Sequence, residues 1–298
     1  MRDEVGSVER SRVLRGYVAL AKPELTLLSV CTAVAAAYLA SLPPVSLTPL
    51  LATLFGTALV GGGAGTLNQL FERNADALMK RTERRPIPAG IVSPRTALGI
   101  GVLLTSGGIV LLAVMANLLS AGIALGTSLL YLVVYTPLKK KTPFATVLGG
   151  IPGALPTLIG WAAVRNEITS QAWALFAILF FWQMPHFLSL AWLYKKDYAR
   201  AGFRMLTVVD PGGRVVRRQM LIYAIALFPA ALMPTVVGLL GLPFLVGAGS
   251  ATLVFIFFVY RFARDMTNSR ARRVFFASVL YLPAILLLMI VEKLVREW

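Results

Sequence analysis

Residues 48–70, TPLLATLFGTALVGGGAGTLNQL, form an uncharged, mostly apolar stretch that ends near Asn68 and is followed by Glu72 and Asp76. About 20 consecutive apolar residues are enough for an α-helix to cross the hydrocarbon core of a bilayer. If the helix continues through the polar residues, their spacing of four places all three on one face, about 6 Å apart along the axis. We therefore expect a membrane helix that carries three oxygen-bearing side chains in a row at one end.

The rest of the chain has the composition of a membrane protein. Its 298 residues are 57% hydrophobic and 14% charged, and the mean hydropathy is +0.75, values typical of a chain embedded in lipid. We expect an all-α polytopic bundle of nine transmembrane helices around a central cavity open to the cytoplasmic side, forming a single domain over residues 1–298. The expected spans are 25–42, 48–70, 97–118, 120–138, 143–163, 171–193, 219–240, 242–262 and 274–292.

The positive charge is distributed in a way that indicates topology. The net charge is +16, and in the nine-span arrangement 26 of the 29 basic residues fall on one side. Lysine and arginine accumulate on the cytoplasmic side of membrane proteins, so we expect a cytoplasmic N-terminus, an external C-terminus and location in the cytoplasmic (inner) membrane. This pattern argues against a nucleic-acid partner, which requires a basic face on a soluble domain. Residues 1–22 are expected to form an amphipathic cytoplasmic arm.

Two inner loops are long, at about 72–96 and 194–218, and four spans separate them. This spacing suggests a pseudo-repeat in which spans 1–4 correspond to spans 5–8. Both loops begin with acidic residues, Glu72 and Asp76 in one and Asp197 in the other. A pseudo-repeat would place these acidic segments opposite each other across the central cavity.

The first acidic segment, NQLFERNADALMKRTERRP at residues 68–86, has the composition of a diphosphate site. Magnesium takes oxygen ligands and typically bridges one or two carboxylates to substrate phosphates, and guanidinium groups form bidentate bonds to phosphate. Asn68, Glu72 and Asp76 could supply the oxygens, and nearby arginines such as Arg81 and Arg85 the donors. The alternative is that Glu72 and Asp76 pair with Arg73 and Lys80 on a solvated helix end.

The second acidic segment, WLYKKDYARAGFRML at residues 192–206, is less specific, because Asp197 could be a solvated acid neutralised by adjacent lysines. The lysine run 139–141, directly after an apolar span, could likewise be a membrane anchor or face the same cavity as the acids.

Three further side chains are candidates for the lining of that cavity. His186 is the only histidine and follows a proline within a span; proline breaks helical hydrogen bonds and can turn a side chain towards a cavity. Its alternative is a buried histidine bonded to a backbone carbonyl. Tyr131 and Tyr135, one turn apart, could present aromatic faces to a carbocation or belong to the interfacial tyrosine belt.

Taken in order, several separated motifs resemble the UbiA-type intramembrane prenyltransferases, and within them the branch that farnesylates heme b. The motifs are N-x-x-x-E-x-x-x-D at 68–76, M-x-R-T-x-x-R-P at 79–86, YTP-L-K at 135–139, P-H-F at 185–187 and K-x-D-Y-x-x-A-G-x-x-M-L at 195–206. Glu72 stands where many members of the wider family have aspartate, which matches the heme branch. Ala201 stands where a second aspartate would complete D-x-x-x-D.

The resemblance implies a reaction that joins the farnesyl group of farnesyl diphosphate to a vinyl group of heme b, with addition of water, giving heme O. It implies catalytic roles for Asn68, Glu72, Asp76 and Asp197, with Mg²⁺ on the last three, a prenyl or carbocation contact at Tyr131 and Tyr135, and a heme contact at His186. The cations that it implies for the diphosphate or the heme propionates are Arg81, Arg85, Lys139, Lys140, Lys195 and Arg200. It also implies hand-over of the product to a downstream heme-modifying enzyme or to terminal oxidase assembly.

Three other functions are compatible with parts of the sequence. A related prenyltransferase could act on another aromatic or tetrapyrrole acceptor. A secondary transporter would place its acids near the centres of the spans, whereas these acids lie towards one surface. A non-catalytic membrane scaffold would tolerate loss of Asp76.

Overall fold

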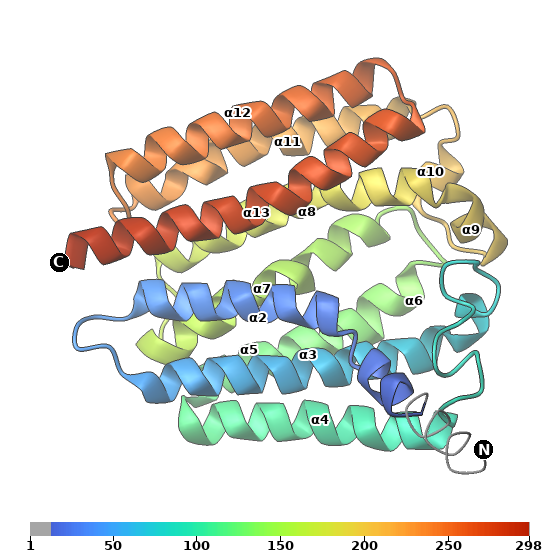
Figure 1. The fold of residues 1–298 in the computed structure, drawn as a ribbon, viewed down its shortest axis with the longest axis horizontal. Coiled ribbons are helices and arrows are strands. Elements are labelled where there is room, and N and C mark those ends of the chain that lie inside the picture. Colours follow the sequence, from blue (N-terminus) through green and yellow to red (C-terminus); the bar gives the residue numbers. More distant parts are fainter. Residues whose placement is uncertain (1–12, 298) are drawn as a thin grey trace, which may run out of the picture.

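A computed structural model describes residues 13–297 of the chain. Within that range nine helices are long and apolar enough to cross a membrane, as expected, and they lie side by side in one bundle (Figure 1). The elements are α2 (Pro23–Ala40), α3 (Leu47–Asp76), α4 (Pro94–Met115), α5 (Leu118–Leu129), η1 (Leu130–Tyr135), α6 (Thr136–Leu138), α7 (Ala145–Arg165), α8 (Ser170–Leu193), α9 (Lys195–Arg200), α10 (Leu206–Val209), α11 (Arg214–Val236), α12 (Leu242–Arg264) and α13 (Asn268–Glu297).

Helix ends differ from the expected spans mainly where charged residues extend a helix beyond its apolar part. Helix α3 continues to Asp76, α11 begins at Arg214 and α13 begins at Asn268. A hydropathy window finds the part of a helix that lies in lipid, whereas backbone hydrogen bonding continues into the more polar region. Of the expected arm 1–22, residues 1–12 lie outside the described residues. Residues 13–20 form a helix with Leu14 and Val18 exposed, as in a helix lying on a membrane surface.

Each spanning helix packs against the next one along the chain, from α2 through α3, α4, α5, α7, α8, α11 and α12 to α13, and α13 returns to α2. Helix α2 also contacts α7, and α8 also contacts α13. Glycines allow some of these helices to approach closely. A β-carbon on Gly160 of α7 would overlap the carbonyl oxygen of Ala33 in α2, so at this crossing the two backbones lie in contact.

We expect Gly160→Ala to destabilise the protein by about 1–3 kcal/mol, because the added methyl group meets backbone and not a movable side chain. The measurement is the Tm of the detergent-solubilised protein. Gly107→Ala in α4 is the matched control, because a β-carbon there has no atom within 4 Å. Alanine is the better helix former, so this control should unfold at or above the wild-type temperature. Equal melting of the two variants would contradict the close α2–α7 crossing.

At one end of the bundle the two long loops meet. Buried apolar side chains join the end of α3 to the segment after α8, and they are Ala75, Met79, Ala191, Ala201, Phe203 and Met205. Arg81 adds a hydrogen bond of 3.5 Å from Nη2 to the Tyr198 hydroxyl and lies over the rings of Tyr194 and Tyr198. The segments expected to lie opposite each other are therefore in contact, and Figure 1 shows α9 beside the loop that follows α3.

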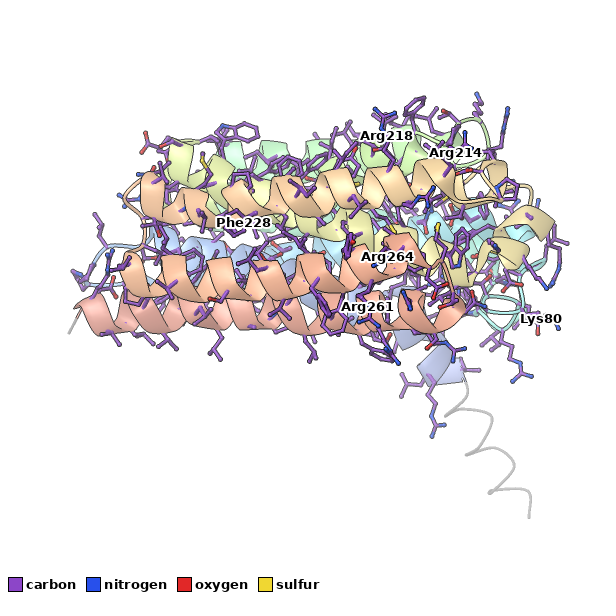
Figure 2. All side chains as sticks on the ribbon, turned by 90° about the horizontal axis from the view of Figure 1, so that it is seen from above. Lys80, Arg214, Arg218, Phe228, Arg261 and Arg264 are labelled. Atoms are coloured by element: carbon purple, nitrogen blue, oxygen red, sulfur yellow. The ribbon has the colours of Figure 1, made fainter. Side chains whose placement is uncertain are left out.

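Basic side chains lie towards this same end. Figure 2 shows Arg214 and Arg218 of α11, and Arg261 and Arg264 of α12, displaced towards the end that carries Lys80. The chain enters the described region near this end and leaves at residue 297 at the other (Figure 1). An odd number of crossings within residues 13–297 accounts for that placement.

The opposite end is closed by α13. The buried Glu292 carboxylate accepts the backbone N–H groups of Gly241 and Phe244, at the start of α12. Next to it, Lys293 Nζ donates to the carbonyl oxygens of Tyr38 at 2.7 Å and Ser41 at 2.6 Å, at the end of α2. Each charge lies at the helix end whose dipole favours it. Helix α13 thus joins the first and eighth spans at the end distant from the long loops.

Candidate active site

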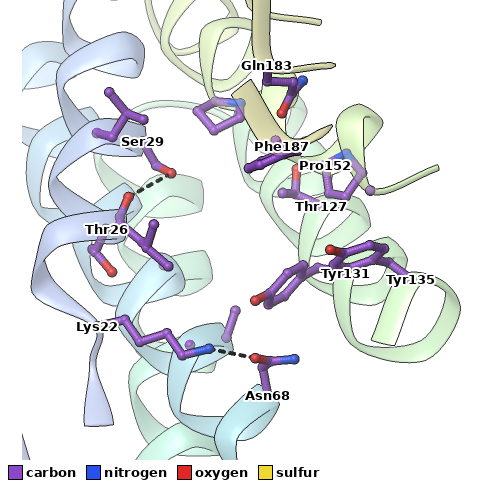
Figure 3. A pocket seen from close by; sticks show the side chains of 18 of the residues that line it. Lys22, Thr26, Ser29, Asn68, Thr127, Tyr131, Tyr135, Pro152, Gln183 and Phe187 are labelled. Atoms are coloured by element: carbon purple, nitrogen blue, oxygen red, sulfur yellow. Dashed lines mark hydrogen bonds between the residues drawn. The ribbon is translucent and has the colours of Figure 1, made fainter. Parts of the chain in front are cut away.

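A cavity of about 390 Å³ lies between α2, α3, the α5–η1 helix, α7 and α8, within the usual size range of ligand pockets. Most of its wall is apolar, including Leu28, Val60, Ile159, Leu179 and Leu282. Its polar groups gather at the end formed by the last turns of α3. Figure 3 shows Lys22 and Asn68 at this end, with Tyr131 and Tyr135 on the facing wall.

The three side chains that are predicted to supply oxygen ligands share one face of α3. Asn68, Glu72 and Asp76 all line the cavity, and their residues are 1%, 7% and 0% exposed. Helix α3 is continuous through Asp76, so the four-residue spacing has the geometric consequence that we expected. A buried carboxylate is costly unless it is paired, and each of these oxygens has a cationic partner.

The partners come from distant parts of the chain. Lys22 Nζ donates to Asn68 Oδ1 at 2.6 Å, Lys139 Nζ lies 2.8 Å from Glu72 Oε1, and Arg85 Nη1 binds both oxygens of Asp76 at 2.8 and 2.7 Å. The expected alternative, pairing with Arg73 and Lys80 along the helix, does not occur among residues 13–297. Arg73 instead donates to the Leu70 carbonyl oxygen at 3.0 Å.

Local structure holds each cation in place. Lys22 precedes Pro23 and has a φ of 46°, a left-handed conformation that is uncommon for a residue with a side chain. Lys139 follows α6, which is tied to α3 by a 3.1 Å bond from Asn68 Nδ2 to the Thr136 hydroxyl. The loop that carries Arg85 is held by Thr82, whose hydroxyl donates to the Asp76 carbonyl oxygen at 2.9 Å.

The pKa values of the two buried lysines are shifted in opposite directions. Burial lowers the pKa of Lys22 to about 7, and the nearby positive charge of Arg85 adds to the effect. Lys139 is also buried, which disfavours its charge, but its contacts with Tyr135 and Glu72 outweigh burial and raise its pKa. Lys139 is therefore protonated. Lys22 has no carboxylate partner among the described residues, and a bound anion would stabilise its protonated form.

The charges at this end of the cavity suit an anion. Lys22, Arg81, Arg85 and Lys139 are the basic side chains of the lining, and Glu72 and Asp76 are the acidic ones. With Lys22 protonated, as a bound anion would favour, two excess positive charges lie beside an apolar chamber. Oxygen donors of this kind fit Mg²⁺ in its usual mode, in which one or two carboxylates hold the ion and substrate phosphates complete the shell.

Asp197 stands apart from the other acids. It does not line the cavity, and its Oδ1 lies 3.5 Å from Arg200 Nη1. Within residues 13–297 no three Asp, Glu, His or Cys side chains come close enough to hold a metal ion. The next residue, Tyr198, does line the cavity, so α9 borders the polar end. The shared metal site of Glu72, Asp76 and Asp197 stays a prediction.

Of the six predicted cations, three line the cavity and three do not. Arg81, Arg85 and Lys139 line the cavity. Lys140 is exposed and Arg200 lies beside Asp197, while Lys195 Nζ lies 3.8 Å from the centre of the Trp192 ring; these three do not line the cavity. Their proposed contact with diphosphate or heme propionates stays a prediction.

The aromatic and histidine candidates do line the cavity. Tyr131 and Tyr135 stack with their ring centres 5.7 Å apart on the π-helical turn η1. Such turns are frequent at functional sites. His186 also lines the cavity, and its Nδ1 lies 2.8 Å from the Ser278 hydroxyl of α13. Neither the belt nor the backbone-bonded alternative describes these positions.

Lys22, Gln183 and Tyr198 also line the cavity, although the sequence reasoning did not single them out. In the sequence, Lys22 is one of the basic residues assigned to the cytoplasmic side. Its place directly before Pro23, the first residue of α2, indicates that it lies at the N-terminal end of a membrane helix. Gln183 is buried within the membrane, and its amide donates to the Gly150 carbonyl oxygen at 2.7 Å. A glutamine within an apolar span is itself a signal, because an uncompensated amide there is costly.

These features define a class, namely a polytopic helical membrane protein with an anion site at the mouth of an apolar intramembrane chamber. The chain belongs to the UbiA prenyltransferase family, whose model matches residues 29–280. It is accordingly an integral multi-pass membrane protein.

Curated relatives and solved structures agree with this assignment. The chain is 45% identical to protoheme IX farnesyltransferase of Solibacter usitatus and 43% identical to that of Salinibacter ruber, in each case over 94% of this chain and 99% of the relative. The solved UbiA homologue from Aeropyrum pernix K1 superposes with a TM-score of 0.74 at 17% identity, over 91% of this chain and 98% of that chain. A homologue from Archaeoglobus fulgidus bound to DMAPP and Mg²⁺ gives a TM-score of 0.67 at 17% identity, over 92% and 98%.

Proposed function

We propose that this protein transfers the farnesyl group of farnesyl diphosphate to a vinyl group of heme b, giving heme O. One observation carries the proposal: three oxygen donors of α3 face three cations at the polar end of an otherwise apolar intramembrane cavity. Relatives that are 45% and 43% identical over nearly their full length are named for farnesyl transfer to protoheme IX.

In the proposed arrangement Glu72 and Asp76, with Asn68 beside them, hold Mg²⁺. A homologue of the same fold has been solved with DMAPP and Mg²⁺ bound, which supports the use of a divalent ion with a prenyl diphosphate. When bound, Mg²⁺ neutralises negative charge on the leaving diphosphate. Lys22 would leave the Asn68 amide, and Arg85 and Lys139 would leave the carboxylates of Asp76 and Glu72, to bind the phosphate oxygens.

Asp197 is proposed as a third acidic ligand once its side chain has left Arg200, its neighbour on the same helix. Their separation of 3.5 Å, with Arg200 exposed, is that of a weak pair. A prenyl diphosphate with its metal offers a stronger partner to either residue.

The chemical step needs no protein nucleophile. The bond between C1 of the farnesyl chain and the diphosphate oxygen breaks, and the electron pair leaves with the diphosphate. The π electrons of the heme vinyl group form the new C–C bond, water adds to the resulting cation, and one proton is lost. Apolar walls keep other water away from the allylic cation, and Tyr131 and Tyr135 offer aromatic faces to it.

Heme b is proposed to contact His186, and the remaining arginines and lysines of the polar end are available for its propionates.

The positive charge of this end favours a cytoplasmic orientation, with the N-terminus inside, the C-terminus outside and the whole chain in the cytoplasmic membrane. Heme O would then leave through the bilayer to a heme-modifying enzyme or to oxidase assembly. The whole of residues 1–298 acts as one domain in this proposal.

Two alternatives are less well supported. A transporter site formed by these acids would lie near mid-membrane, but Asn68, Glu72 and Asp76 occupy the last turns of α3. Another aromatic or tetrapyrrole acceptor is compatible with the cavity, and only the product distinguishes it. His186 and the names of the relatives favour heme.

The test is an assay in proteoliposomes that contain farnesyl diphosphate, heme b and Mg²⁺, with product identification by mass. We expect the mass of heme b plus one farnesyl group and one hydroxyl group, because one proton is lost when water adds. Removing divalent ions with a chelator should slow the reaction at least about 100-fold, because charge stabilisation by a metal contributes several kcal/mol, and added Mg²⁺ should restore it. Full turnover under chelation would contradict the metal site. A product formed only with another acceptor would support a prenyltransferase that acts on a different aromatic or tetrapyrrole substrate.

A further inference from the structure

Contacts with several aromatic rings and with Ser278 fix the position of the His186 imidazole. Its ring stacks on the rings of Trp182 and Phe275, with ring centres 5.2 and 5.1 Å away and interplanar angles of 22° and 29°, and it meets Phe187 edge-on at 5.5 Å. The polar atoms of the imidazole, Nδ1 and Nε2, lie on its edges.

One of those edges is occupied by Ser278. His186 Nδ1 lies 2.8 Å from Ser278 Oγ. The same hydroxyl donates to the Phe275 carbonyl oxygen, three residues earlier in α13, at 2.5 Å. A serine hydroxyl has a single proton, and here that proton is used in the bond to Phe275. Towards His186 the hydroxyl can only accept, so the proton between the two residues belongs to Nδ1.

The position of Ser278 is fixed by a second bond from the same helix. Trp182 Nε1 donates to the Ser278 carbonyl oxygen at 2.9 Å, one turn of α8 before His186. Ser278 is fully buried. Residue 278 of α13 therefore anchors two side chains of α8, one through its backbone and one through its hydroxyl.

The opposite edge of the ring is open. Within residues 13–297 no group is hydrogen-bonded to Nε2 of His186, and this atom is not completely buried. His186 lines the cavity and its Nδ1 is held by Ser278, so Nε2 is the ring nitrogen that is available to a ligand there. No ion pair to His186 occurs in the described part of the chain, and an unpaired charge inside a span is costly. The neutral ring with its proton on Nδ1 leaves a lone pair on Nε2.

We propose that Ser278 is a positioning residue that holds His186 in the Nδ1–H tautomer, so that the unprotonated Nε2 faces the cavity as a ligand for the iron of the acceptor heme. The assignment of the ligand rests on the proposed function, whereas the tautomer rests on the hydrogen bonds alone. In metal sites the partner of the second ring nitrogen commonly fixes the tautomer and orientation of a histidine ligand.

The tautomer can be measured directly, because the chain contains one histidine. Protein labelled with ¹⁵N-histidine and freed of any polyhistidine tag gives the signals of a single imidazole. We expect the Nδ1 signal of a protonated nitrogen and the Nε2 signal of an unprotonated one. In Ser278→Ala this preference should be lost or reversed, with Trp182 still bonded to the backbone, and Ser278→Thr should retain it. A wild-type spectrum with the proton on Nε2 would overturn the proposal.

Heme titration tests the role as a ligand. Ser278→Ala should weaken binding of heme b at least about 10-fold, the lower range for loss of a partner to a metal-binding histidine, and should change the visible spectrum of the bound heme. His186→Ala should give a loss at least as large. Ser120→Ala is the matched control, because Ser120 is buried and its hydroxyl also donates to a carbonyl three residues earlier, at 2.9 Å; it should bind heme as the wild type does.

The outcomes separate the two proposals. Wild-type affinity and spectrum in Ser278→Ala would overturn the positioning role while leaving farnesyl transfer intact. A wild-type protein that forms its product with another acceptor and binds no heme b would overturn the proposed function, and the tautomer measured by ¹⁵N would still stand or fall on its own.

Discussion

Asp76→Asn is expected to lower kcat/KM for farnesyl transfer at least about 100-fold, because it removes a charged ligand of the Mg²⁺ that would neutralise the leaving diphosphate. Asp76 is fully buried, lines the cavity and is bound through both oxygens by Arg85. Asparagine has nearly the same volume and retains one oxygen for Arg85, so the fold should survive. The measurement is product formation in proteoliposomes, together with the Tm of the purified variant.

The control for Asp76→Asn is Asp265→Asn. Asp265 also pairs with an arginine, Arg270, at 2.9 Å, but its side chain is 53% exposed and it does not line the cavity. Loss of an exposed pair costs about 1 kcal/mol or less, so this variant should remain active. Full activity of Asp76→Asn would contradict a metal site at Asp76.

Asp197→Asn addresses the third proposed ligand. If Asp197 turns towards the metal when substrate binds, the variant should lose activity as Asp76→Asn does. Normal turnover and normal Mg²⁺ dependence would remove Asp197 from the metal site and leave the ion to Glu72 and Asp76.

The second large effect is expected for Lys22→Met, in a residue that the sequence did not single out. Lys22 is held against Asn68 at the polar end of the cavity, as Figure 3 shows, and has no carboxylate partner in the described chain. Its charge is therefore available for a phosphate group. Loss of a buried cation from such a contact costs about 2–5 kcal/mol, so kcat/KM for farnesyl diphosphate should fall at least about 30-fold.

Two variants make the Lys22 result specific. Lys22→Arg keeps the charge and should recover part of the lost activity. Lys141→Met removes an exposed lysine that lies outside the cavity, so it changes the net charge equally and should leave kcat/KM nearly unchanged. Equal losses in Lys22→Met and Lys141→Met would indicate a general effect of surface charge and contradict a phosphate contact at Lys22.

The sequence predicted most of the architecture, because the features concerned are local. Apolar stretches of membrane length gave the nine spans found within residues 13–297. The four-residue spacing from Asn68 to Asp76 correctly predicted a shared helical face. Both follow from the fixed rise and turn of an α-helix, which depend only on neighbours in the chain.

The ion pairs could not be predicted in the same way. Local reasoning offered Arg73 and Lys80 as partners of the acids, but the folded chain uses Arg85 and Lys139. Lys139 is 67 residues from Glu72 and Lys22 is 46 residues from Asn68. No periodicity in the sequence encodes contacts of that range.

The sequence by itself thus determined a nine-helix membrane protein with acidic side chains along one face of its second span. Only the tertiary structure decided which cations complete that site, that Asp197 lies outside it in this arrangement, and that Ser278 fixes His186. The physical reason is that helix formation and membrane insertion depend on short segments, whereas ion pairing and hydrogen bonding between helices depend on which side chains the packed bundle brings within about 3 Å of each other.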